Sequence, residues 1–124
     1  MKRGIKQRIN YKVNQCKLAT TQGSGDLEVL ATPALIASLE EASRQAVAPY
    51  LSENSTTVGG YIEVTHMKPT AEGETYYVES VLTDIDRSKL TFELSAFDKS
   101  GQIGKGTHVR FVVNRDKFMS NISK

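Results

Sequence analysis

The chain has 124 residues, of which 39% are hydrophobic and 24% are charged. This length and composition are typical of one globular domain with a sizeable core, and they exclude a disordered chain. The 16 Lys and Arg residues against 14 Asp and Glu residues leave a net charge of +2, which points to no particular partner.

The sequence also bears on compartment and partners. The single cysteine, Cys16, excludes an intramolecular disulfide and fits a reducing compartment. The N-terminal segment MKRGIKQRINYK is basic, but it lacks the apolar stretch of a secretory signal, and we interpret it as a strand with a solvated basic face. No apolar run approaches the roughly 20 residues that cross a bilayer. We therefore expect one cytoplasmic domain over residues 1–124, with neither nucleic acid nor membrane as a partner.

The first predicted element is a strand over residues 5–13, because apolar and polar side chains alternate along IKQRINYKV. The segment TTQGSGD at residues 20–26 has the two glycines and small polar side chains of a loop. A long helix is predicted next, since Thr32 suits an N-cap and Pro33 suits the first helical position. One apolar stripe recurs at spacings of four and three: Leu35, Leu39, Ala42, Ala46 and Tyr50. The helix should extend over about residues 32–50.

The rest of the chain predicts four consecutive strands separated by polar turns. They cover residues 60–67, 75–85, 89–97 and 102–113. A strand, a long helix and four strands in meander order predict an α+β domain, in which the helix covers an antiparallel sheet of about five strands.

Two adjacent glutamates, Glu40 and Glu41, lie in the predicted helix. With about 100° per residue, Glu40 falls about 140° from Leu35, at the edge of the apolar arc, and Glu41 falls about 240° away, on the polar face. Only Glu40 should therefore be held in a half-buried site that tunes a carboxylate for acid–base chemistry. A boundary glutamate with no function is the structural alternative.

The two histidines lie on strands. His66 shares a strand face with Ile62 and Val64, the face expected to turn toward the helix, and a buried structural histidine is the alternative to a catalytic one. For His108, on the face opposite to Val109, a structural role is preferred. Two histidines and one cysteine without metal-ligand spacing predict no metal site.

Three motifs carry a family resemblance: Thr-Pro-Ala-Leu at the helix start, V-G-x-x-x-x-V-x-H with Pro shortly after, and G-x-G-T-H-x-R in the last strand. In their order and spacing, residues 29–118 resemble the hot-dog-fold thioesterases, in particular the branch typified by fluoroacetyl-CoA thioesterase. In that family a threonine, a glutamate eight residues on and a histidine on the next strand form the catalytic set. The resemblance thus implies that Thr32, Glu40 and His66 are catalytic.

The same resemblance implies that Gly59 lies against the thioester and that Arg110 lines the substrate pocket. Backbone N–H groups at Gly59 and Gly60 are candidates to stabilise an oxyanion, because glycine permits close approach. The implied protein is a hot-dog-fold acyl-CoA thioesterase without cofactor or metal. It should act as a homodimer or a dimer of dimers, with its site at the subunit interface; an exposed sheet edge also favours pairing.

Several alternatives stay open at this point. The chain could instead be a non-catalytic acyl-CoA-binding protein, or a hot-dog dehydratase that acts on 3-hydroxyacyl thioesters. A cystatin-like or nuclear-transport-factor-like fold would explain the strand order but not the catalytic spacing. The acyl carrier, CoA or a carrier protein, is also open.

The chain departs from the family just before the helix. There the family has aromatic residues that cover a small fluorinated acyl group, whereas QGSGDLEV has none. We expect the loop at residues 20–28, with its two glycines, to be mobile and to cover the acyl site poorly. The expected substrates are therefore short-to-medium acyl-CoAs, with little gain for fluoroacetyl over acetyl.

Overall fold

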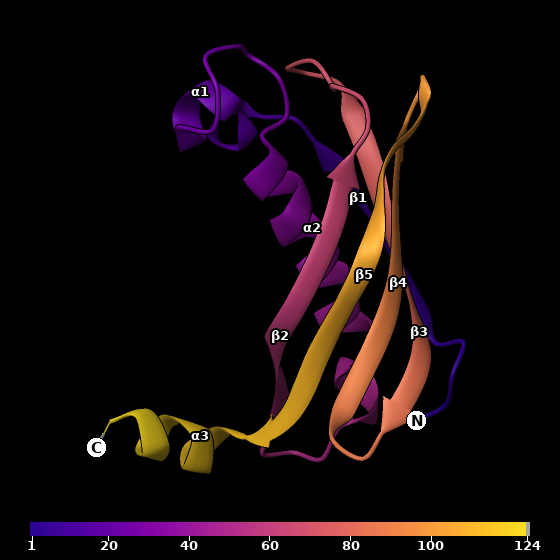
Figure 1. The fold of residues 1–124 in the computed structure, drawn as a ribbon, viewed down its shortest axis with the longest axis vertical. Coiled ribbons are helices and arrows are strands. Elements are labelled where there is room, and N and C mark those ends of the chain that lie inside the picture. Colours follow the sequence, from indigo (N-terminus) through magenta and orange to yellow (C-terminus); the bar gives the residue numbers. More distant parts are fainter. Residues whose placement is uncertain (124) are drawn as a thin grey trace.

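An antiparallel sheet curves around one long helix in the computed structural model, which describes residues 1–123 (Figure 1). The sheet has five strands in the order β1-β3-β4-β5-β2. Their bounds are Lys6–Lys12 (β1), Ser55–His66 (β2), Thr75–Asp86 (β3), Lys89–Asp98 (β4) and Gly101–Asn114 (β5). Helix α2, Thr32–Val47, lies along the concave face and continues into a 3-10 turn at Ala48–Tyr50 (η2). The predicted α+β architecture is confirmed.

Three parts of the backbone differ from the sequence prediction. Strand β2 begins at Ser55, five residues before the predicted start at 60, because the polar residues there pair with the end of β5; Thr57, for example, lies opposite Val112. The predicted loop at 20–26 begins with a short helix, α1 (Ala19–Gln22), preceded by a 3-10 turn, η1 (Gln15–Lys17). A further helix, α3 (Arg115–Ile122), follows β5 and extends away from the sheet (Figure 1).

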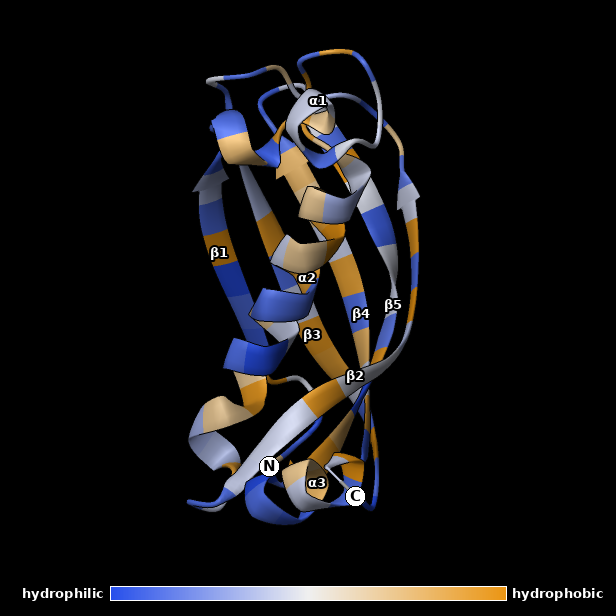
Figure 2. Cartoon of the chain, turned by 90° about the vertical axis from the view of Figure 1, so that its left-hand side faces the viewer, coloured by the Kyte–Doolittle hydropathy of each residue, from blue (hydrophilic) through white to orange (hydrophobic). Residues whose placement is uncertain are grey.

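The core lies between α2 and the middle strands. Fully buried side chains of the helix, such as Leu35 and Leu39, belong to the same cluster as Leu82 of β3 and Phe92 of β4. Figure 2 shows α2 lying in front of the sheet, with apolar residues recurring along the strands behind it. The predicted apolar stripe holds except at its end, where Tyr50 is 55% exposed because it lies in the 3-10 turn, outside the α-helical rotation.

Strand β2 lies at one edge of the sheet and positions part of the candidate site. A register shift between Gly59 and Tyr61 makes Gly60 an extra residue, a β-bulge. On the far side of the bulge, Ile62 and Val64 pack against the core, as predicted. No helix within residues 1–123 is long and apolar enough to cross a membrane.

Candidate active site

The first residue of α2 contacts the last residue of β2. Thr32 Oγ1 lies 2.7 Å from Nδ1 of His66, which is hydrogen-bond distance. The prediction that Thr32 is the N-cap was wrong by one residue: the backbone of Ala31 takes the N-cap conformation, with no side-chain cap. The Thr32 side chain is engaged by the imidazole instead, so its hydroxyl belongs to the site rather than to the helix end.

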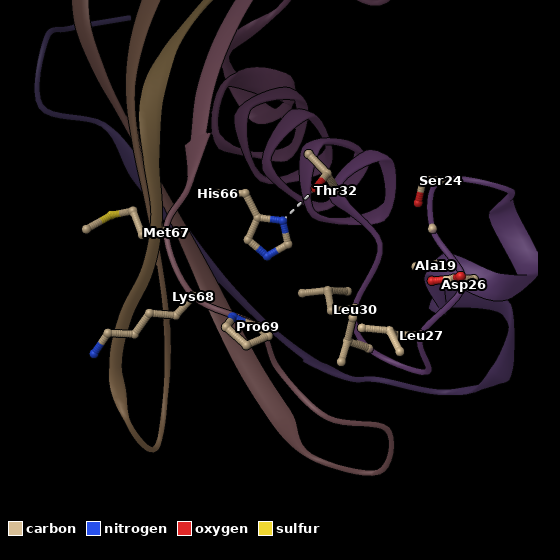
Figure 3. A pocket seen from close by; sticks show the side chains of 12 residues that line it. Ala19, Ser24, Asp26, Leu27, Leu30, Thr32, His66, Met67, Lys68 and Pro69 are labelled. Atoms are coloured by element: carbon tan, nitrogen blue, oxygen red, sulfur yellow. Dashed lines mark hydrogen bonds between the residues drawn. The ribbon is translucent and has the colours of Figure 1, made fainter.

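The second nitrogen of His66, Nε2, is buried and makes no hydrogen bond to any of residues 1–123. Burial lowers the pKa of His66 below its usual value, so the imidazole is neutral at physiological pH. Figure 3 shows this nitrogen directed away from Thr32, into a cavity of about 350 Å³. A neutral imidazole with one free nitrogen can give or take a proton at a ligand in that cavity.

One wall of this cavity comes from the segment before α2. Ser24, Asp26 and Leu27 line it, with Lys68 and Pro69 on the opposite side (Figure 3). None of these side chains is aromatic. The segment nevertheless carries large apolar side chains: Leu27, which is 68% exposed, and Leu30, which is buried.

Glu40 lies elsewhere on the same helix. It follows Thr32 by eight residues, and at 1.5 Å per residue the two are about 12 Å apart along the axis. The structure therefore brings Thr32 and His66 together, but within one chain it does not bring Glu40 to them. As the helical count predicted, Glu40 is half-buried at the edge of the packed face, with a side chain that is 42% exposed.

Glu40 faces Gly59 on β2. A Cβ at Gly59 would lie 3.2 Å from Glu40 Oε2 and 3.4 Å from Cε1 of His108, so the glycine leaves the space between these groups open. Gly60, in the bulge, has its missing side chain on the opposite face, where a Cβ would run into the ring of Phe111. Both glycines line a second cavity of about 360 Å³, together with Glu40 and His108.

Arg110 lies behind this second cavity. Its side chain is 8% exposed, and its Nη1 is 4.0 Å from Glu40 Oε2. Nε donates to Thr57 Oγ1 at 2.8 Å, and Nη2 donates to the Thr57 carbonyl at 2.9 Å. Nη1 lies 3.1 Å from Nε2 of His108. Arg110 thus contacts the groups that form the cavity wall.

Sequence reasoning missed His108 as a member of this group. The residue is 1% exposed, and its Nδ1 lies 2.7 Å from the carbonyl oxygen of Tyr61. Burial lowers the pKa of His108, and the charge of Arg110 lowers it further. The motif G-x-G-T-H-x-R could have identified His108, because it places His108 and Arg110 two residues apart and hence on one strand face.

Glu41 is not the fully solvated residue that the helical count predicted. It is half-buried, and its carboxylate accepts a hydrogen bond from the hydroxyl of Tyr11. Burial and the adjacent carboxylate raise the pKa of Tyr11, so the hydroxyl keeps its proton and stays a donor. The reason is tertiary: α2 packs against β1 as well as β3, and β1 covers this flank of the helix.

Residues 1–123 contain no group of three or more His, Cys, Asp or Glu side chains placed to hold a metal ion. Cys16 is exposed and donates to the side chain of Asn14.

Comparisons with known proteins place this chain in a family. Residues 13–116 match the family described as fluoroacetyl-CoA-specific thioesterase. The fluoroacetyl-CoA thioesterase of Streptantibioticus cattleyicolor is 36% identical over 95 residues, which is 77% of this chain and 68% of that protein. A crystal structure of a mutant of the fluoroacetyl-CoA-specific thioesterase superposes with a TM-score of 0.93 at 29% identity, covering 99% of this chain and 96% of that one.

More distant structures share the fold. A hot-dog-like protein from Thermanaerovibrio acidaminovorans has a TM-score of 0.89 at 20% identity, over 97% of this chain and 89% of that one. A thioesterase superfamily member from Thermus thermophilus has a TM-score of 0.90 at 19% identity, over 98% and 90%. The predicted hot-dog fold is confirmed.

Proposed function

The chain belongs to the fluoroacetyl-CoA-specific thioesterase family, a family of thioester hydrolases, and we propose that it hydrolyses short-to-medium acyl-CoA thioesters at a site formed by Thr32, His66 and Glu40. The observation that carries this proposal is the Thr32–His66 pair, whose free Nε2 borders a cavity. A buried polar atom without a partner is costly, and an acyl thioester or a water molecule would satisfy it.

The proposed reaction adds water across the thioester carbonyl and breaks the C–S bond. Glu40 takes the proton of the attacking water, or attacks the carbonyl carbon itself to form an acyl anhydride that water then hydrolyses. When the Thr32 hydroxyl donates to Nδ1, Nε2 of His66 carries the hydrogen and can pass it to the departing thiolate. Backbone N–H groups at Gly59 and Gly60 stabilise the oxyanion. The products are a carboxylate and free CoA thiol.

The proposed site is completed by a second copy of the chain. Each protomer carries two half-sites on one helix: Thr32 with His66, and Glu40 with Gly59, about 12 Å apart. The edge strand β2 borders both and has unpaired backbone groups on its outer side. Antiparallel pairing of two β2 strands about a twofold axis would set the Thr32–His66 half-site of one protomer against the partner's Glu40.

Subunit mixing tests this assembly. Glu40→Gln and His66→Gln variants, each inactive alone, are co-expressed with different tags, and the heterodimers are isolated. If the site is shared between subunits, one of the two symmetric sites is intact and kcat recovers to about half of the wild-type value. No recovery, or a clean monomer in sedimentation at micromolar concentration, would contradict the shared site.

Thiol release tests the chemistry. The assay covers a panel of short, branched, aromatic and long acyl-CoAs, with Glu40→Gln beside the wild type. Loss of the carboxylate should lower kcat by about 10²-fold or more. Tight acyl-CoA binding without thiol release would instead identify a binding protein, and hydration of a crotonyl thioester would identify a dehydratase.

A further inference from the structure

We infer that His108 is a positioning residue for the proposed reaction: it holds the Arg110 guanidinium at a fixed distance from Glu40, so that the carboxylate remains available at the cavity. This inference rests on the proposed function, in which Glu40 is catalytic. His108 touches neither Thr32 nor His66, and its role is exerted through Arg110.

The hydrogen bonds of His108 define its tautomer. A backbone carbonyl can only accept, so Nδ1, 2.7 Å from the Tyr61 oxygen, must carry the hydrogen. An arginine can only donate, so Nε2, 3.1 Å from Arg110 Nη1, must carry a lone pair. Both contacts are satisfied only by the neutral Nδ1–H imidazole. The ring is 1% exposed, so water does not replace either partner.

Arg110 is held on three sides. Thr57 accepts from Nε and from Nη2, and His108 accepts from Nη1. These contacts fix the plane of the guanidinium and leave Nη1 at 4.0 Å from Glu40 Oε2. That separation allows electrostatic attraction but is too long for a hydrogen bond. Arg110 therefore attracts the Glu40 carboxylate electrostatically but does not form a hydrogen bond with it.

Removal of the acceptor at position 108 would change this balance. Nη1 would keep a buried N–H without a partner, which is costly, and the nearest anionic acceptor is Glu40. The open space at Gly59 lies between these groups: a Cβ there would be 3.2 Å from Glu40 Oε2 and 3.7 Å from Arg110 Nη1. With no side chain in the way, Arg110 and Glu40 would close into a direct ion pair. The carboxylate would then be turned from the cavity and neutralised as a base.

Two amide substitutions separate the two hydrogen bonds of His108. The amide of His108→Gln reaches the position of Nε2 and can accept from Arg110, whereas the amide of His108→Asn reaches only the position of Nδ1 and can donate to Tyr61. We expect His108→Gln to keep kcat within a few-fold of wild type. His108→Asn should lose about 10- to 100-fold in kcat with little change in KM, because a small displacement of a reacting group has an effect of that size. Thr57→Val, which removes the acceptor for Arg110 Nε, should lower kcat in the same way.

The inference is overturned if His108→Asn is as active as wild type. It is also overturned if His108→Asn preserves activity while His108→Gln does not, since the role of His108 would then be to support β2 at Tyr61, next to the bulge. The imidazole ¹⁵N spectrum of the ligand-free wild-type protein provides a readout independent of catalysis. A protonated Nδ1 and an unprotonated Nε2 are expected for His108, and the opposite tautomer would overturn the inference. An active Glu40→Gln variant would remove the proposed function together with this inference, whereas an inactive Glu40→Gln beside a fully active His108→Asn would remove this inference alone.

Discussion

The hydroxyl of Thr32 lies 2.7 Å from Nδ1 of His66, although the two residues are 34 positions apart in the chain. The contact joins the start of α2 to the end of β2, and it leaves Nε2 of the histidine as the free nitrogen of the cavity. The first prediction follows from this contact.

Thr32→Val should lower kcat with little effect on stability, because the hydrogen bond that it removes is exposed to solvent. The variant keeps the shape of the side chain but removes the hydroxyl that orients His66. Because Ala31 is the N-cap, the helix loses no side-chain cap, and the loss of about 1 kcal/mol typical of a removed cap should not appear. Thiol-release kinetics and urea unfolding measure the two effects, and Thr32→Ser, which keeps the hydroxyl, is the control. Equal kcat in Val and Ser variants would show that the hydroxyl has no part in the reaction.

Tyr11→Phe should have the opposite effect, with lower stability and an unchanged kcat. The substitution removes the hydrogen bond to Glu41 and leaves a half-buried carboxylate without its donor, so the free energy of unfolding should fall by about 1–2 kcal/mol. Turnover should be unchanged, since Glu41 lies on the flank of α2 covered by β1. Glu41→Gln should likewise retain kcat, in contrast to Glu40→Gln. A large loss of kcat in Glu41→Gln would mean that the helical count selected the wrong glutamate.

The helical count shows what one sequence can and cannot predict. Side-chain directions on a helix follow from its fixed rotation per residue, so the half-buried position of Glu40 was predictable. The environment of Glu41 was not, because it depends on where β1 lies in the sheet, and β1 pairs with β3 far along the chain. The Thr32–His66 contact was suggested by family resemblance alone; helical and strand periodicity place each residue on a face but do not measure the distance between them.

The strands likewise have features that a local sequence pattern predicts and features that depend on distant parts of the chain. Alternation predicted the middle of each strand, where one face is buried, but not the start of β2, where Ser55 begins a polar stretch held only by pairing with β5. Alternation also placed His108 and Arg110 on one face. Their partners, Tyr61 and Thr57, follow from the β2–β5 register and its bulge at Gly60, which no local pattern encodes.

The two histidines predict how stability depends on pH. Burial lowers the pKa of His66 and of His108 in the folded protein, while both should titrate near pH 6.5 when unfolded. As the pH falls below about 6.5, the unfolded chain takes up protons that the folded chain does not, so the free energy of unfolding should decrease, by at most about 1.4 kcal/mol per pH unit for each histidine.

Urea unfolding between pH 8 and pH 5 measures this slope. His108→Gln, which removes one of the two groups, should make it shallower. A free energy of unfolding that stays level or rises as the solution is acidified would contradict the buried, neutral state of both rings.

The last prediction concerns the acyl group. The segment before α2 lines the cavity at His66 with Ser24, Asp26 and Leu27, and it supplies no aromatic side chain to close over a small substituent. Even in a fitted pocket, a difference of one methylene is worth only about 1–3 kcal/mol, and an open cavity should discriminate less. We therefore expect similar kcat/KM values for acetyl-CoA and fluoroacetyl-CoA, with activity retained on somewhat longer acyl chains. Measurement of kcat/KM for both substrates tests this expectation. A preference for fluoroacetyl-CoA above about 10³-fold would exceed what such contacts supply. It would require a closed, substituent-specific pocket that this segment does not build.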